Sequence, residues 1–320
     1  MILFETGIKI SDTDFQQYYP NISSNISTEI LEPYERVAWY NHMHQYVGLT
    51  LAESLKTASS GWMQEAGKLA KTALAHFLIF EAMPSLNITV DNAGIKEGQA
   101  PSKWSFDQAR WSAVVIGERA LADLLSLLVD NIGETELATY AESQYYGNHS
   151  TRLYKEYRSY LDYSHIHGMK TYLAMRRYIT MAEDDLIEDI VSEEQFATST
   201  DSDNSKDIHL LILMRRATAA MSMIHAIPAL NVYITNNSVL VLDSIDGMNN
   251  TRYGVNSRDN KDAIDRLLAS LRVQYAKYVG KINVWLSRHE DHFTEWADLQ
   301  VTTTRANMVA LDDGTGDVIL

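Results

Sequence analysis

Histidine is the residue type best suited to chemistry in this chain. Three closely spaced pairs are the candidate metal ligands: His42 and His44, His165 and His167, and His289 and His292. On a helix, His42 and His44 point to different faces and cannot share a metal. His289 and His292 lie one helical turn apart and could chelate one, but they lack the H-E-x-x-H spacing of a zinc hydrolase. We therefore expect a solvated, charged helix end at His289 and His292.

The carboxylates give no clearer site. Glu183, Asp184 and Asp185 lack the alternating spacing and turn glycine of a calcium loop, so we expect a solvated acidic face. No histidine has a glutamate three residues before it, which argues against a di-iron helical bundle. Glycine motifs for binding phosphates or dinucleotides, and the nucleophile elbow, are absent as well. We expect no catalytic residue, cofactor or metal; an enzyme of unfamiliar type that uses the histidine clusters is the alternative.

A repeated stretch organises the chain around these residues. Residues 69–92 and 213–236 align without a gap at a shift of 144, with eight identities in 24 positions. In each copy an apolar helix meets a proline, Pro84 or Pro228, which removes an amide donor and should stop the helix. A short strand then leads to a turn-prone pair. The sequence therefore predicts an internal repeat in which each copy ends in a β-hairpin.

Apolar periodicity extends each copy into a helix–hairpin–helix unit. Helices are predicted over 28–47, 63–83, 105–131, 208–227 and 262–288. The tyrosines at 154, 157, 160 and 163 predict a packed helix face with its hydroxyls toward water; an aromatic interface with another subunit is the alternative. Acidic and polar residues at 198–205 predict a mobile linker.

The expected fold class is mainly α with small β-hairpins, built from two pseudo-repeated helix–hairpin–helix units plus an extended C-terminal arm. Residues 1–134 form the first unit. Residues 135–297 form the second, with a tyrosine-rich helical preface and an acidic linker. Residues 298–320 form the arm, which either frays or adds to a sheet edge of another subunit. We expect the arm and the two hairpin turns to form an assembly interface, through Val309, Leu311, Val318, Ile319, Leu320, Asp91, Asn92, Asn236 and Asn237.

Composition narrows the class of function. The chain has 320 residues, no cysteine and a net charge of −15. Such a surface repels phosphate, so adhesive nucleic-acid binding is not expected, although DNA could slide past an acidic wall. Solubility is the simpler interpretation of the charge. We find no run of about 18 apolar residues and expect no membrane partner and no export signal.

The chain resembles an uncharacterised family in three features. These are the opening helix with Leu31-Glu32-Pro33-Tyr34, the helix-to-strand transition A-x-P-x-L-N-[IV] followed by Asn92-Ala93-Gly94-Ile95, and the helix that ends with Leu124–Leu128. That family is encoded in phage and prophage structural gene clusters of Bacteroidetes. The resemblance covers most of residues 1–290 and implies a virion protein assembled in the host cytoplasm. More specifically, it implies a head-tail connector or neck-ring subunit that binds itself, the portal and tail proteins around passing DNA. A soluble helical adaptor of the host cell is the alternative.

Overall fold

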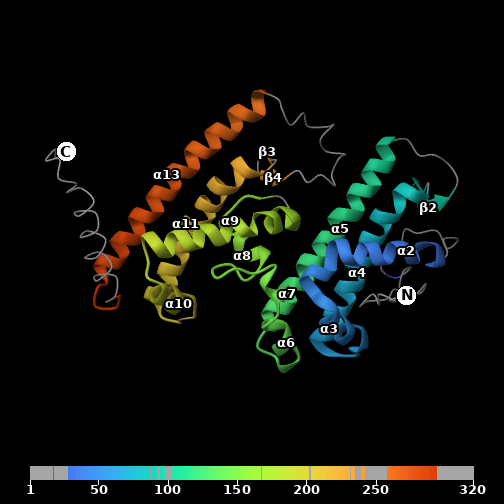
Figure 1. Cartoon of the computed structure of the whole chain (residues 1–320), viewed down its shortest axis with the longest axis horizontal. Coiled ribbons are helices and arrows are strands. Elements are labelled where there is room, and N and C mark those ends of the chain that lie inside the picture. Colours follow the sequence, from blue (N-terminus) through green and yellow to red (C-terminus); the bar gives the residue numbers. More distant parts are fainter. Residues whose placement is uncertain are drawn as a thin grey trace, which may run out of the picture.

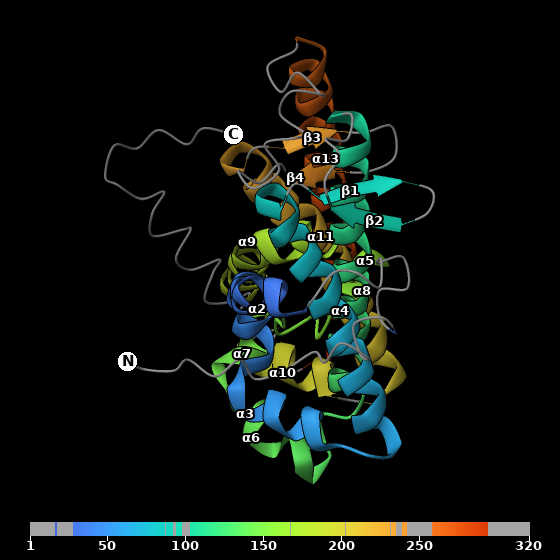
Figure 2. The ribbon, with the colours of Figure 1, turned by 90° about the vertical axis from the view of Figure 1, so that its right-hand side faces the viewer.

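The computed structural model describes residues 17, 28–86, 88–91, 94–97, 103–166, 168–201, 203–230, 232–234, 239–241 and 258–293. In these residues the chain is mainly helical, as predicted. Two helical bundles lie side by side, each around its own hydrophobic core (Figure 1). Both strand pairs lie toward the same end of the molecule (Figures 1 and 2).

The first unit contains α2 (Thr28–Ala38), the π-helical turn η1 (Trp39–Met43), α3 (His44–Thr57), α4 (Gly61–Leu86), β1 (Ile88–Asp91), β2 (Gly94–Glu97) and α5 (Lys103–Asp130). The chain bends inside α3 because Gly48 adopts φ 70° and ψ 166°. The sequence prediction ended the opening helix at this glycine. A Cβ atom at position 48 would lie 2.5 Å from the ring of Tyr145, so close packing as well as positive φ favours glycine here.

The second unit contains α9 (Gly168–Asp189), α10 (Glu193–Asp201), α11 (Ser205–Ala229), β3 (Val232–Ile234), β4 (Val239–Val241) and α13 (Arg258–Arg288). Its order of elements follows that of the first unit. α4 packs between α2 and α5, and α11 packs between α9 and α13. The internal repeat predicted from the stretches 69–92 and 213–236 therefore extends over most of the chain.

Each unit carries one antiparallel strand pair after its central helix. In the first, Asp91 pairs with Gly94; in the second, Ile234 pairs with Val239. The turn residues Asn92, Asn236 and Asn237 lie outside the described residues, so the turns themselves are not tested.

The two prolines do not stop their helices where the sequence predicted. Pro84 and Pro228 lie inside the last turns, and the helices end at Leu86 and Ala229. The missing proline amide removes one hydrogen bond close to the helix end, where the helix continues only briefly. The predicted boundaries at Met83 and Ile227 consequently fall slightly short of the observed ones.

The segment between the units contains η2 (Thr135–Leu137), α6 (Ala138–Ala141), α7 (Gln144–Gly147) and α8 (Tyr157–Leu161). The prediction of one tyrosine helix face with its hydroxyls toward water is wrong here. Tyr154 and Tyr160 are fully buried in the second core. The Tyr154 hydroxyl donates to the carbonyl of Arg215, and the Tyr160 hydroxyl lies 2.9 Å from Ser222 Oγ. Burial in the core decided this arrangement, because each hydroxyl finds an internal partner there.

The predicted acidic linker is also wrong for part of its length, since residues 193–201 form helix α10. Ser192 and Gln195 cap its start reciprocally: the Gln195 amide donates to Ser192 Oγ at 3.2 Å, and the Ser192 amide donates to Gln195 Oε1 at 3.4 Å. This is a capping box. Asn204 then caps α11 by accepting from the Lys206 amide at 2.9 Å.

Helix α11 is apolar and long enough to cross a membrane by length and composition alone, although Arg215 and Arg216 interrupt its apolar run. Of the most apolar 18-residue stretch of this helix, 61% is buried within the structure. It lies between α9 and α13 and supplies the middle of the second core. Its apolar composition is therefore explained by burial in a protein core.

Candidate functional site

A polar cluster of the first unit joins η1 to α4. His42 Nε2 lies 2.8 Å from Glu81 Oε1, and Asn41 Nδ2 donates to the same oxygen at 3.1 Å. The His42 ring stacks on Phe77 with 4.3 Å between centroids. Burial lowers the pKa of His42, against the raising effect of its bond to Glu81, and that bond lowers the pKa of Glu81. The pair ties two helices together.

A cavity of about 270 Å³ opens beside this cluster, where the first unit meets α9. Its lining mixes polar and apolar side chains: Asn41, His42, Gln45, Tyr46, Phe77, Glu118, Leu121, Met169, Lys170, Leu173 and Ala174. Lys170 Nζ lies 3.6 Å from Glu118 Oε1, so an ion pair joins α9 to α5. The volume is just below the usual range of ligand pockets. We interpret the cavity as part of the contact region between the first unit and α9, which we call the seam between the units.

Further contacts join α5 to the segment between the units. Arg158 donates to Asp123, and Ser126 donates to Glu156. Ser126 is only 4% exposed and contacts Glu156 and Arg158 of that segment. The outward side of α5 is therefore a docking surface that is already occupied within the chain.

Glu183 corrects the prediction of a solvated acidic face. It is fully buried and accepts hydrogen bonds from Thr151 Oγ1 at 2.7 Å, the Leu153 amide at 2.9 Å and the Arg152 amide at 3.2 Å. Burial raises the pKa of Glu183, and these hydrogen bonds oppose that rise. Glu183 thus fixes the non-helical segment 151–153 against α9, which is a structural role.

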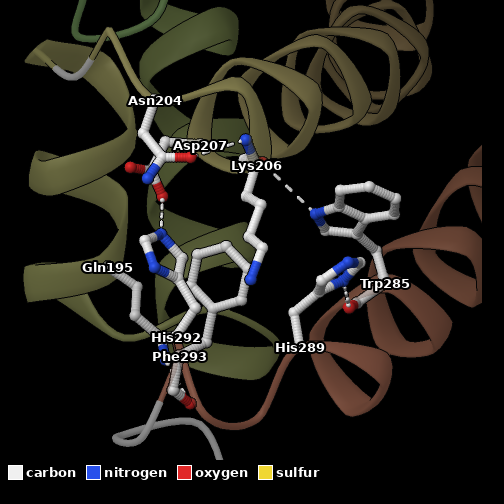
Figure 3. A network of polar contacts seen from close by, with 8 residues as sticks. All are labelled: Gln195, Asn204, Lys206, Asp207, Trp285, His289, His292 and Phe293. Atoms are coloured by element: carbon white, nitrogen blue, oxygen red, sulfur yellow. Dashed lines mark hydrogen bonds and ion pairs between the residues drawn. The ribbon is translucent and has the colours of Figure 1, made fainter.

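The end of α13 is held by a polar network, shown in Figure 3. His292 Nε2 lies 2.8 Å from Asp207 Oδ1, a carboxylate whose side chain is 3% exposed. Trp285 Nε1 donates to the Lys206 carbonyl at 3.2 Å. His289 Nδ1 lies 2.9 Å from the Trp285 carbonyl oxygen. The prediction of a solvated cluster is therefore wrong for His292, which secures α13 to the beginning of α11.

The described residues hold no group of three or more histidine, aspartate or glutamate side chains placed to bind a metal ion. His289 and His292 do not converge, because each ring has its own separate oxygen partner. The polar clusters described above join helices to one another.

Most of the predicted interface residues lie outside the described residues. This holds for Val309, Leu311, Val318, Ile319 and Leu320 and for three of the four turn residues. Asp91 is described as the last residue of β1. The chain leaves the described structure after Phe293, next to the His292 network, so any C-terminal arm starts from an anchored point (Figure 3).

These observations define a helical protein of two tandem units whose polar clusters serve packing. The chain belongs to a family of unknown function, DUF6712, whose model matches residues 37–162 and again residues 171–306. The ends of the two matches, at positions 162 and 306, are related by the same shift of 144 that relates the repeated stretches. No curated protein and no solved structure matches the chain significantly.

Sequence reasoning overlooked several of the residues that position these surfaces. Ser192 and Gln195 carried a readable signal, the S-x-x-Q capping pattern. Glu183 and Asp207 carried none, because a buried and an exposed carboxylate look alike in a run of acids. Asp123 and Ser126 on α5 likewise gave no sign that Glu156 and Arg158 contact them.

Proposed function

We propose that this protein is a structural subunit of a phage head-tail connector or neck ring, joining portal to tail around a DNA conduit. The observation that carries the proposal is the seam between the units. One unit of this fold docks on the next through α5 and α9, with an ion pair at Lys170–Glu118. The intervening helix α8 also packs on α5, where Arg158 pairs with Asp123. A fold that already packs against its own repeat is suited to packing against further copies.

Two further features support the proposal. The net charge of −15 suits a wall past which DNA slides without adhering. The resemblance to proteins of phage structural gene clusters points to a virion component. In this proposal each unit is a helix–hairpin–helix module, and residues 298–320 form an arm that adds to a neighbouring subunit through its apolar residues.

The test is the mass and shape of the protein in solution, from light scattering and negative-stain imaging. The full chain and a chain ending at Asp298 should be compared. We expect closed rings from the full chain and their loss on truncation. A chain that stays monomeric, and that also fails to bind portal rings from the same gene cluster, would contradict the proposal. That result would favour a soluble helical adaptor.

A further inference from the structure

The segment between helices α7 and α8, residues 148–156, has no helix or strand and runs where the two bundles meet (Figure 1). We call this segment the strap. The second unit holds its main chain: Tyr172 Oη of α9 donates to the His149 carbonyl at 3.0 Å, and Arg176 Nε of α9 donates to the Ser150 carbonyl at 3.1 Å. These hydrogen bonds fix the beginning of the strap to the first helix of the second unit.

The side chain of His149 is bonded to the first unit instead. Its Nε2 lies 2.8 Å from the hydroxyl of Tyr140, and that hydroxyl donates to the Tyr46 carbonyl of α3 at 2.8 Å. Tyr140 and Tyr46 belong to the first hydrophobic core, whereas Tyr172 belongs to the second. One residue thus connects the two cores, the first through its ring and the second through its carbonyl.

These contacts determine which nitrogen of the His149 ring carries the proton. Burial raises the pKa of Tyr140, so its hydroxyl is protonated, and a carbonyl can only accept. Because the Tyr140 proton goes to the Tyr46 carbonyl, His149 Nε2 carries the proton that lies between it and the Tyr140 oxygen. The other nitrogen, Nδ1, is then unprotonated, and it has no hydrogen-bond partner among the described residues. His149 is therefore neutral in this arrangement.

The surroundings of this ring disfavour a second proton. His149 is 1% exposed, and its ring lies against Tyr140 of α6 and Tyr146 of α7, with 6.3 and 5.4 Å between the ring centroids. The charged group that acts on it is Arg176 of α9. Burial first, and the positive charge of Arg176 second, lower the pKa of His149 to about 4, while its own main chain opposes them with a smaller effect. A proton on Nδ1 is thus disfavoured as long as both units enclose the ring.

The internal repeat indicates that packing alone does not require a histidine at this position. At the shift of 144, His149 corresponds to Phe293, which follows α13 in the second unit and is 4% exposed. The Phe293 carbonyl also accepts a hydrogen bond from a side chain, Gln195 Nε2 at 3.4 Å. A phenylalanine therefore suffices at the corresponding position of the second unit, and the ring that can titrate lies at the junction between the units.

We infer that His149 is a proton-operated latch between the two units, which holds them together while its ring is neutral and favours their separation once the ring is protonated. Separation removes one wall of the site, either Tyr140 and Tyr146 or α9, and so admits water to Nδ1. A solvated histidine binds a proton that the closed site excludes, and by linkage the ratio of open to closed chains rises on acidification. The inference concerns the two units of one chain and holds whether or not the chain forms a ring.

The expected size of the effect follows from the two states of His149. The pKa is about 6.5 for a solvated histidine and about 4 in the closed chain. The contribution of His149 to closure is therefore complete above pH 6.5 and is lost as the pH falls toward 4. Between pH 7.5 and pH 5 the ratio of open to closed chains should rise about thirtyfold.

Thiol labelling measures this ratio even when few chains are open, because the chain has no cysteine and a buried thiol reacts only after opening. Met169 and Met175 both lie on α9 and are 2% and 1% exposed. Met169 is buried in the first core, whereas Met175 is buried in the second. Separation of the units therefore exposes a thiol introduced by Met169→Cys and leaves one introduced by Met175→Cys covered.

The two full-length variants should be labelled with a dithiodipyridine, which reacts with thiols in mild acid, and each rate divided by that of a cysteine peptide at the same pH. From pH 7.5 to pH 5 we expect the ratio for Met169→Cys to rise about thirtyfold and the ratio for Met175→Cys to rise clearly less. An equal rise in both means that α9 unfolds or the whole chain does, and overturns the inference. No rise in Met169→Cys overturns it as well.

Substitutions of His149 in the Met169→Cys chain identify the group that titrates. His149→Gln keeps an N–H donor for Tyr140, and His149→Phe copies the residue at the corresponding position of the second unit; neither side chain titrates in this range. Whichever of the two keeps the helical content of the wild type should label with little dependence on pH. The matched control, His76→Gln, removes another buried histidine and should retain the rise. A rise that persists without His149, or that disappears without His76, assigns the opening to another group and overturns the inference.

Discussion

Glu81 and His225 hold the same place in the two units, related by the shift of 144 (225 − 81). Each contacts a side chain that obeys the same shift, because 185 − 41 is also 144. Asn41 Nδ2 donates to Glu81 Oε1 at 3.1 Å, and His225 Nε2 lies 2.7 Å from Asp185 Oδ2. The repeated helices therefore pack in one register, while the carboxylate has moved from one helix to the other.

This equivalence predicts that the first unit's pair can be transplanted into the second. Asp185→Asn with His225→Glu should stay within about 1 kcal/mol of wild type in the free energy of unfolding. His225→Glu alone places two carboxylates together and should cost about 1–2 kcal/mol, a modest value because both side chains are partly exposed to screening solvent. Urea unfolding at pH 7 measures both. Equal losses for the single and double variants would contradict the shared register.

Gly48 predicts a large effect of a small substitution. Gly48→Ala should destabilise the protein by about 2–4 kcal/mol, because it combines positive φ with a Cβ that meets the ring of Tyr145. Gly280→Ala is the matched control. Position 280 lies inside α13 with nothing within 4 Å of an added Cβ, so alanine there should stabilise by up to about 1 kcal/mol. Thermal and urea unfolding of the two variants should move in opposite directions.

Two buried histidines predict a stability that falls as the pH is lowered. Burial lowers the pKa of His76 to about 4, and burial together with the nearby Arg176 lowers the pKa of His149 to about 4. Between pH 6.5 and 4 the unfolded chain binds protons that the folded chain does not. Stability from these groups is thus complete above pH 6.5 and is lost as the pH falls toward 4.

Urea unfolding between pH 7.5 and 5 measures this loss above the range in which most carboxylates titrate. His76→Gln with His149→Gln should flatten the dependence. The interpretation fails if the double variant keeps the slope of the wild type.

His292 predicts a loss of anchoring at the end of α13. His292→Ala removes one hydrogen-bond partner of the Asp207 carboxylate, which is 3% exposed, and should cost about 1–3 kcal/mol. His289→Ala removes mainly a ring contact with Trp285 and should cost less than about 1 kcal/mol. Unfolding experiments and limited proteolysis near residue 290 distinguish them.

The same two variants address the metal alternative. Metal analysis of the purified protein should show no bound ion that the His289→Ala, His292→Ala double variant loses. A stoichiometric metal lost in that variant would revive the interpretation of these histidines as ligands.

Local sequence patterns were sufficient to predict the main helices and the internal repeat. The periodicity around Leu69 and Leu213, the glycine at 48 and the sites of the two strand pairs follow from steric limits and apolar spacing, which act over short distances along the chain. Their boundaries were less secure, as the helices that continue past Pro84 and Pro228 illustrate. The family match adds that the repeat extends well beyond the stretches 69–92 and 213–236 that display it.

Burial was decided only by the tertiary structure. Tyr154, Glu183 and Asp207 read as surface residues in sequence, yet all three are buried, because hydrogen-bond partners from distant segments compensate the loss of water. The burial of Ser126 likewise depends on Glu156 and Arg158, which lie 30 and 32 residues further along the chain. By itself the sequence determined a mainly helical chain with an internal repeat. The tertiary packing determined which of the described side chains are buried, since that depends on contacts between residues far apart in the chain.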